Sequence, residues 1–139
     1  MFTQGRYWHG NEPCHQIPYM FDAAGRWDLT QKYVRHIMDT EYMATPGGLS
    51  GNDDAGQMSA WYVFSALGFY PVAPSTPYYY IGVPAFESIT LDAGGKLLNI
   101  RRKGADGYVC TKITYDGNPL NDFRLSHDLL INGGTLLFE

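Results

Sequence analysis

Two short acidic clusters are the part of this sequence best suited to chemistry. Residues 10–12 read Gly-Asn-Glu, and about forty residues further on residues 51–54 read Gly-Asn-Asp-Asp. Carboxylates mixed with amide oxygens are suitable ligands for a hard cation such as Ca²⁺. Two carboxylates that face one bond also suit glycoside hydrolysis, in which one protonates the leaving oxygen and the other activates water. The residue types therefore point to cation binding and to hydrolysis of a glycoside.

The second cluster lies in a glycine-rich loop, residues 46–57, which leads into an apolar helix predicted from Met58 to Leu67. Each cluster precedes a predicted helix, so two helices lying side by side would bring Glu12 close to Asp54. A carboxylate mounted on a rigid helix would be held still for a reaction. The alternative is that Asp54 only caps the helix, where its side chain accepts from N–H groups and meets the positive end of the helix dipole.

Side chains near the first cluster are candidates to extend the site. His9 and His15 lack the spacing of a zinc site, which leaves contact with a substrate or a structural role for both. Trp8 is suited to stacking on the face of a sugar and equally to packing in the core. The spacing of the carboxylates in residues 52–54 differs from that of an EF-hand loop.

The composition narrows the class of protein. The chain has 139 residues, enough for one domain with a core, and 15% of them are aromatic, which suits both core packing and sugar binding. A net charge of -4 argues against a nucleic-acid partner, and the basic run at residues 101–103 is interpreted as a solvated strand end. Cys14 and Cys110 are predicted to be buried thiols rather than a disulfide. Neither a membrane span nor a signal peptide is expected from the sequence.

Apolar periodicity predicts helices in the first half of the chain and strands in the second. Helices are expected over residues 14–24, from Asp28 as the N-cap to about Tyr42, and from Met58 to Leu67. Strands are expected over residues 78–82, 88–92, 96–102, 108–115, 128–131 and 135–138, with turns between them. The pattern predicts an α+β fold, with a helical segment over residues 1–71 and an antiparallel β-sandwich portion over residues 72–139.

The predicted helices do not make a complete layer by themselves. The helix from Met58 to Leu67 is apolar on nearly every face, so it should be buried and needs partners on several sides. Two short amphipathic helices cannot supply these partners, which predicts that the sequence is a C-terminal fragment of a larger enzyme. Exposed apolar helix faces would then favour self-association of the isolated chain.

Two long motifs closely resemble the C-terminal portion of glycoside hydrolase family 92. They are residues 7–16 (YWHGNEPCHQ) and residues 48–71 (GLSGNDDAGQMSAWYVFSALGFYP), and residues 80–84 and 116–120 are similar to the closing strands of the family. The resemblance covers nearly the whole chain. It implies part of a calcium-dependent, inverting exo-α-mannosidase of the α-1,2 type that removes terminal mannose from glycans. It also implies that the helices end an (α/α)₆ barrel, that the strands belong to a β-sandwich packed against it, and that the parent protein is secreted or periplasmic.

The resemblance further implies roles for individual residues. Asp54 matches the general base that activates water, and Asn11 and Glu12 match a pair that faces calcium and the sugar. The calcium ion would hold two adjacent sugar hydroxyls and help to distort the ring. The candidate set is Asp54 and Asp53 for catalysis, Glu12, Asn52, Trp8 and His15 for substrate binding, and Asn11, Glu12 and Gln16 for the metal.

One part of the family's machinery is expected outside this sequence. By the resemblance, the general acid is a glutamate upstream of the first motif, and the sequence starts shortly before that motif. General acid catalysis contributes about 10²–10⁴-fold, so the isolated chain is predicted to be inactive or nearly so. The alternative is a carbohydrate-binding or interaction module without catalysis, which would not need Asp54.

Overall fold

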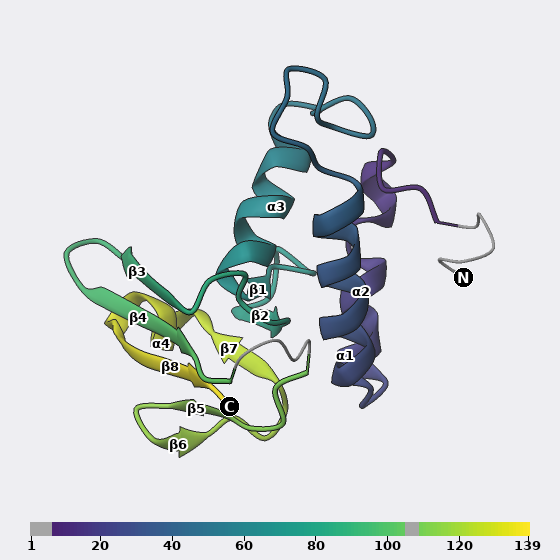
Figure 1. Cartoon of the computed structure of the whole chain (residues 1–139). Coiled ribbons are helices and arrows are strands. Elements are labelled where there is room, and N and C mark those ends of the chain that lie inside the picture. Colours follow the sequence, from purple (N-terminus) through teal and green to yellow (C-terminus); the bar gives the residue numbers. More distant parts are fainter. Residues whose placement is uncertain (1–6, 105–108) are drawn as a thin grey trace.

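The chain folds into a group of helices that stands beside two β-sheets (Figure 1). The computed structural model describes residues 7–104 and 109–139. In chain order its elements are the 3₁₀ helices η2 (Glu12–Cys14) and η3 (Ile17–Tyr19), then α1 (Met20–Ala23), α2 (Trp27–Thr40), α3 (Gln57–Leu67), β1 (Phe69–Tyr70), β2 (Tyr78–Ile81), β3 (Ser88–Asp92), β4 (Leu97–Arg102), β5 (Ile113–Tyr115), β6 (Asn118–Pro119), β7 (Arg124–Ser126), α4 (His127–Asn132) and β8 (Gly134–Phe138). The predicted α+β class is confirmed.

The first predicted helix is broken into three pieces, η2, η3 and α1. Pro13 and Pro18 each lie at the start of a 3₁₀ helix, because a residue without an N–H cannot continue the hydrogen-bond ladder of a longer helix. The prediction that Asp28 caps α2 is wrong by two residues. Arg26 occupies the N-cap, and its guanidinium donates two hydrogen bonds of 2.8 Å to the carboxylate of Asp28.

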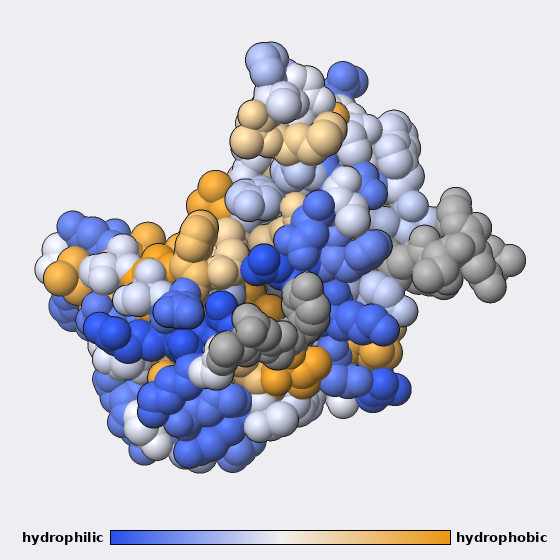
Figure 2. Space-filling view, viewed as in Figure 1, coloured by the Kyte–Doolittle hydropathy of each residue, from blue (hydrophilic) through white to orange (hydrophobic). Residues whose placement is uncertain are grey.

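Helix α3 is buried on one side only, which corrects the prediction of a helix buried all round. Met58 and Trp61 are fully buried against the other helices, whereas Tyr62 and Val63 are 36% and 57% exposed. The elements of this chain that contact α3 most are α2 and β1, and they leave the face with Tyr62 and Val63 uncovered. Apolar residues (orange) consequently remain visible in the hollow between the helices and the sheet (Figure 2).

The strands form two sheets, one of them mixed. The first has the order β1-β2-β7 and is antiparallel, and the second has the order β3-β4-β8-β5-β6. Strand β8 pairs in parallel with β4, from Leu98 opposite Gly134 to Arg102 opposite Phe138, so the prediction of purely antiparallel strands is wrong at this pair. Strand β1 lies before the predicted boundary at residue 71 and pairs with β2 beyond it.

Helix α4 replaces the strand predicted over residues 128–131. The hydroxyl of Ser126 accepts from the backbone N–H of Leu129, Asp128 lies in the first turn, and Gly133 ends the helix. The strands β1, β6 and β7 were not predicted, because two or three residues are too few to show a period of two. The predicted strand over residues 108–115 is reduced to β5, and residue 108 lies outside the described residues.

Side-chain contacts join the helices to the sheets. The buried amide of Gln31 on α2 accepts from the N–H of Cys110 at 2.7 Å and donates to its carbonyl at 3.3 Å. The ring of Trp27 stacks on that of Phe123, with centroids 4.4 Å apart. Cys14 and Cys110 are free thiols, as predicted, although Cys14 is only half-buried.

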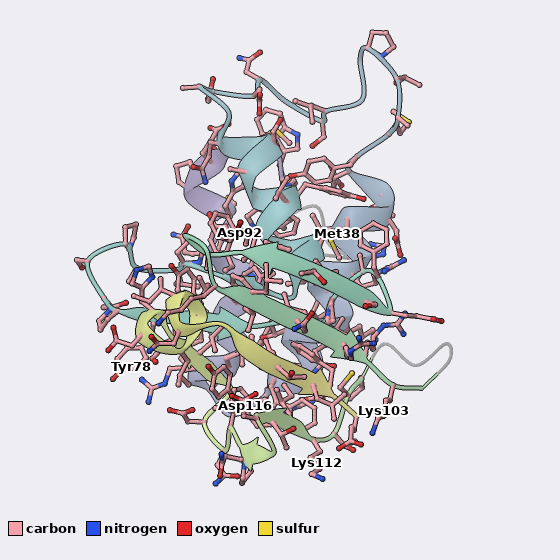
Figure 3. All side chains as sticks on the ribbon, turned by 90° about the vertical axis from the view of Figure 1, so that its left-hand side faces the viewer. Met38, Tyr78, Asp92, Lys103, Lys112 and Asp116 are labelled. Atoms are coloured by element: carbon pink, nitrogen blue, oxygen red, sulfur yellow. The ribbon has the colours of Figure 1, made fainter. Side chains whose placement is uncertain are left out.

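Charged residues and a cavity occupy the outer parts of the β portion. At the end of the larger sheet Glu139 forms ion pairs with Lys103 and Lys112, both labelled in Figure 3. A cavity of about 630 Å³ lies where the α1–α2 turn meets the loop before β7, and its lining includes Asp22, Trp27, Tyr80, Asp122 and Arg124. Among the described residues, no helix has the length and apolar character needed to cross a membrane.

Candidate active site

The two acidic clusters meet through their glycines. The backbones of Gly10 and Gly51 touch so closely that a Cβ atom on Gly51 would lie 2.6 Å from the Cα of Gly10. A Cβ atom on Gly10 would lie 2.8 Å from the carbonyl oxygen of Ser50. Only glycine permits this approach of two main chains. The contact brings Asn-Glu of the first motif beside Asn-Asp-Asp of the second.

Replacing Gly51 by alanine is therefore expected to push the two motifs apart. We expect a loss of about 1–3 kcal/mol in the free energy of unfolding, measured by urea denaturation of the chain. Gly47→Ala is the matched control, because Gly47 lies in the same loop and a Cβ there would meet no atom within 4 Å. Equal free energies of unfolding for the two variants would contradict the importance of this contact.

Asp53, rather than Asp54, caps helix α3. Its Oδ1 accepts from the N–H of Ser59 at 2.9 Å, and its carbonyl accepts from the N–H of Met58. The helix has Gly56 at its N-cap with no side-chain bond. Asp54 and Ala55 both adopt left-handed backbone conformations, with φ of 44° and 57°. Such a conformation costs a non-glycine residue about 1–2 kcal/mol, and among the described residues the side-chain capping bond comes from Asp53 and not from Asp54.

The exposed carboxyl of Asp54 lies beside that of Glu12. A hydrogen bond with the Glu12 side chain, and then the negative charge of Glu12, raise the pKa of Asp54 above its usual range. The Oε1 atom of Glu12 is buried, and no hydrogen-bond partner for it is found among the described residues. The predicted proximity of these two carboxylates is thus present. A pair of like-charged groups with an unpaired buried oxygen is a place where a cation would be favourable.

The other predicted metal ligands flank this pair. Asn11 is exposed, and its Nδ2 donates to the sulfur of Cys14 at 3.4 Å, which turns Oδ1 away from that sulfur. Gln16 is half-buried and occupies the N-cap of η3. Within residues 7–104 and 109–139, no group of three or more His, Cys, Asp and Glu side chains is arranged to hold a metal ion. A cation here would need amide, backbone or ligand oxygens besides the carboxylates.

Trp8 and Asn52 lie on the surface of the site. Trp8 is 59% exposed, and its indole lies over Gly10, where an added Cβ would be 2.7 Å from Cζ2. Asn52 is exposed next to Asp53. The structure therefore favours surface contact for Trp8 over the core packing that the sequence left open. Both residues are accessible to a ligand at the junction of the motifs.

His15 lies beneath the surface, with both ring nitrogens engaged. It is 1% exposed, its Nε2 lies 2.9 Å from the carbonyl oxygen of His9, and its Nδ1 lies 3.3 Å from Nε2 of Gln57. The indole N–H of Trp61 donates to its carbonyl at 2.9 Å. Burial lowers the pKa of His15, although the bond to His9 and the charge of Glu12 oppose this. Any effect of this ring on a substrate must therefore act through neighbouring groups.

His9 is the centre of a second buried set of contacts. Its Nδ1 lies 2.8 Å from the hydroxyl of Tyr7, and its Nε2 lies 2.6 Å from that of Tyr42, which donates to the carbonyl of Met58. Burial, and then the charge of His15, lower the pKa of His9 to about 3. The ring is therefore neutral at ordinary pH. Reasoning from the sequence missed Tyr42, since it lies outside both motifs.

Comparisons of the sequence and the structure with known proteins point to a single family. The model of the glycosyl hydrolase family 92 catalytic domain matches residues 1–139. A family 92 α-mannosidase from Bacteroides thetaiotaomicron, solved in complex with mannoimidazole, is 41% identical with a TM-score of 0.91, covering 96% of this chain and 18% of that chain. A family 92 inverting mannosidase from the same species is 39% identical with a TM-score of 0.88, covering 99% and 19%.

A curated protein is similar as well. An uncharacterised secreted glycosidase from Arthroderma benhamiae is 30% identical, over 91% of this chain and 17% of its own length. The chain thus spans less than a fifth of each of these relatives. Because the family model matches the whole sequence, the chain belongs to glycoside hydrolase family 92.

Proposed function

We propose that this chain supplies the water-activating and cation-binding side of the active site of an inverting exo-α-mannosidase. The carboxyl pair of Glu12 and Asp54, at the junction of two motifs, is the observation that carries the proposal. One solved relative of the chain is described as an α-mannosidase and another as an inverting mannosidase. The proposed substrate is a terminal α-linked mannose of a glycan, with an α-1,2 linkage.

Asp54 acts as the general base in this proposal. Its side chain is exposed and is not used to cap α3, so it is accessible to a water molecule beside a bound sugar. A base works best when its pKa lies nearer the working pH than that of an ordinary carboxyl group, and the neighbouring Glu12 shifts the pKa of Asp54 in that direction. Asp53 is the second catalytic carboxylate of the proposal, and its bond to Ser59 anchors the loop that carries Asp54.

Asn11, Glu12 and Gln16 are the proposed calcium ligands. Their oxygen donors, and the unpaired Oε1 of Glu12 in particular, fit a hard cation. When bound, calcium would supply positive charge that holds sugar hydroxyls and favours a distorted ring. Glu12 then has two tasks, since the same carboxyl group that receives the cation also lies beside Asp54.

The remaining candidates contact or support the sugar. Trp8 offers an exposed indole for stacking against an apolar sugar face, and Asn52 offers an amide for hydrogen bonds. His15 is proposed to influence the substrate indirectly, because the buried ring supports Glu12 and the turn that carries Glu12. Neither Glu12 nor Asp54 is assigned the role of general acid, and we propose that this group comes from a preceding part of the parent protein.

The wider architecture follows from the same proposal. We infer that the helices are the end of an (α/α)₆ barrel and that the sheets belong to a β-sandwich packed on it. The exposed face of α3, with Tyr62 and Val63, is then where preceding barrel helices would lie, and in the isolated chain it remains the predicted surface for self-association. Export of the parent protein is proposed by analogy with the secreted relative.

The decisive experiment compares hydrolysis of an α-1,2-linked mannobiose by this chain and by the full-length parent protein. Each is assayed with added calcium and with a chelator. We expect calcium-dependent release of mannose with inverted configuration from the parent, and no detectable release from the isolated chain, because the general acid is proposed to come from another part of the parent protein. Activity of the parent that is indifferent to the chelator would overturn the calcium assignment, and absence of mannosidase activity in the parent would overturn the function.

A further inference from the structure

The hydrogen bonds around His15 allow only one position for its proton. The carbonyl oxygen of His9 can only accept, so Nε2 of His15 must carry a hydrogen and donate it. The Nδ1 atom of the neutral ring is then an acceptor, and Nε2 of Gln57 donates to it. The same amide group also donates to the hydroxyl of Tyr70 at 3.0 Å. The orientation of Gln57 is therefore determined together with the tautomer of His15.

The contacts of His9 have the same property. The carbonyl of Met58 can only accept, so the single hydroxyl hydrogen of Tyr42 must point to it. The oxygen of Tyr42 accordingly accepts from Nε2–H of His9, which leaves Nδ1 to accept from the hydroxyl of Tyr7. The two imidazole rings are stacked with centroids 4.5 Å apart. Both histidines are thus fixed as Nε2–H tautomers within one buried cluster.

This buried cluster connects the two loops that carry the carboxylates of the site. His15 follows Glu12 by three residues, and Gln57 follows Asp54 by three residues and begins α3. The bond from Gln57 to His15 therefore links the two loops independently of the contact between their glycines. The bond from His15 to the carbonyl of His9 reaches the segment immediately before Gly10.

We propose that His15 and Gln57 are positioning residues that fix Glu12 relative to Asp54 through a single proton arrangement. The proposal rests on the proposed function, which gives the two carboxylates their task. His15 is too deeply buried to act on the sugar itself, and the amide nitrogen of the half-buried Gln57 is engaged by His15 and Tyr70. Their contribution is geometric: they reduce the number of arrangements that the carboxyl pair can adopt.

The proton arrangement is tested directly by nuclear magnetic resonance. The histidine side chains of this chain are labelled with ¹⁵N, and long-range couplings between ring protons and ring nitrogens are measured. These couplings report which ring nitrogen carries the hydrogen. We expect Nε2–H for both His9 and His15 at neutral pH. An Nδ1–H form of His15, or a mixture of the two tautomers, would overturn the proposal, because the bond to the His9 carbonyl would then be absent.

The effect on function is tested with a matched pair of variants in the full-length parent protein. His15→Leu removes both ring bonds, whereas His15→Gln can retain an N–H donor toward the His9 carbonyl. We expect His15→Leu to lower kcat by about 10- to 100-fold with a smaller change in KM, and His15→Gln to recover part of the loss. His36→Gln, at an exposed position of α2, is the control and should leave kcat unchanged.

The kinetic outcomes separate positioning from simple stabilisation. All rates are expressed per folded molecule, as counted by circular dichroism. A kcat of His15→Leu that equals wild type would overturn the proposal, as would equal losses in both variants. If the parent does not hydrolyse mannosides, the proposed function fails, and the tautomer measurement alone still decides the proton arrangement.

Discussion

Replacing Asp54 by asparagine in the full-length parent is expected to lower kcat by about 10²–10⁴-fold. Asparagine keeps the size of the side chain and tolerates a left-handed backbone, so the φ of 44° is retained. It can still form a hydrogen bond with Glu12 but cannot accept a proton from water. The loss should therefore appear in kcat for mannoside hydrolysis, with little change in KM or in the unfolding transition.

Two comparisons make this result specific to Asp54. Glu87→Gln removes an exposed carboxylate just before β3, outside both motifs in the sequence, and should leave kcat unchanged. An Asp54→Asn enzyme with a kcat within about threefold of wild type would refute its role as base. That result would instead support a module that binds carbohydrate without hydrolysing it, provided that sugar binding persists.

The stability of the chain should fall as the pH rises from about 4 to about 8 because of Asp22. Burial raises the pKa of this carboxyl from 3.8 to about 7, against the smaller opposing effect of the neighbouring Thr30. A carboxyl group whose pKa is higher in the folded state binds its proton more tightly there. The free energy of unfolding therefore decreases as the pH rises above the pKa of the unfolded state, and it continues to decrease until the pH passes the pKa of the folded state. The total loss is up to about 4 kcal/mol.

The variant Asp22→Asn isolates this effect from other titrations. Urea unfolding of wild type and variant across the pH range should give free energies that are most alike near pH 4. The variant should become the more stable by up to about 4 kcal/mol near pH 8. The exposed Asp92→Asn is the control for the loss of a surface carboxylate and is measured across the same pH range. A constant difference for Asp22→Asn would mean that its carboxyl group is not buried.

Long elements and long motifs were predictable from the sequence. The apolar stripe of α2 and the alternation in β3 and β4 were strong enough to give these elements nearly their observed bounds. The helix α4 was missed because a short run of Leu and Ile resembles a strand, although Ser126 and Gly133 supplied helix-capping residues at its two ends. Parallel pairing of β8 with β4 depends on partners far apart in sequence, which local patterns do not encode.

The sequence predicted which residues lie at the candidate site better than it predicted the contacts that each of them makes. Glycines before each cluster indicated that the chain turns there, but not that Gly10 and Gly51 touch each other. The sequence placed Asp54 at the start of a helix, and only three-dimensional geometry assigns the capping bond to Asp53. The partners of His9 and His15 come from separate elements, including Tyr42 after α2 and Gln57 on α3, so their burial could not be read from spacing.

The position of β8 determines when the larger sheet can be completed during synthesis. Strands β3 and β4 form one hairpin and β5 and β6 another, and within this sheet the two hairpins are joined through β8 alone, among the residues that the structure describes. The ribosome must therefore translate through Phe138 before β8 can pair with β4 and β5 and so join the two hairpins. A stop codon at position 133 would remove β8 from the middle of the sheet, leaving two open edges available for misassembly between nascent chains.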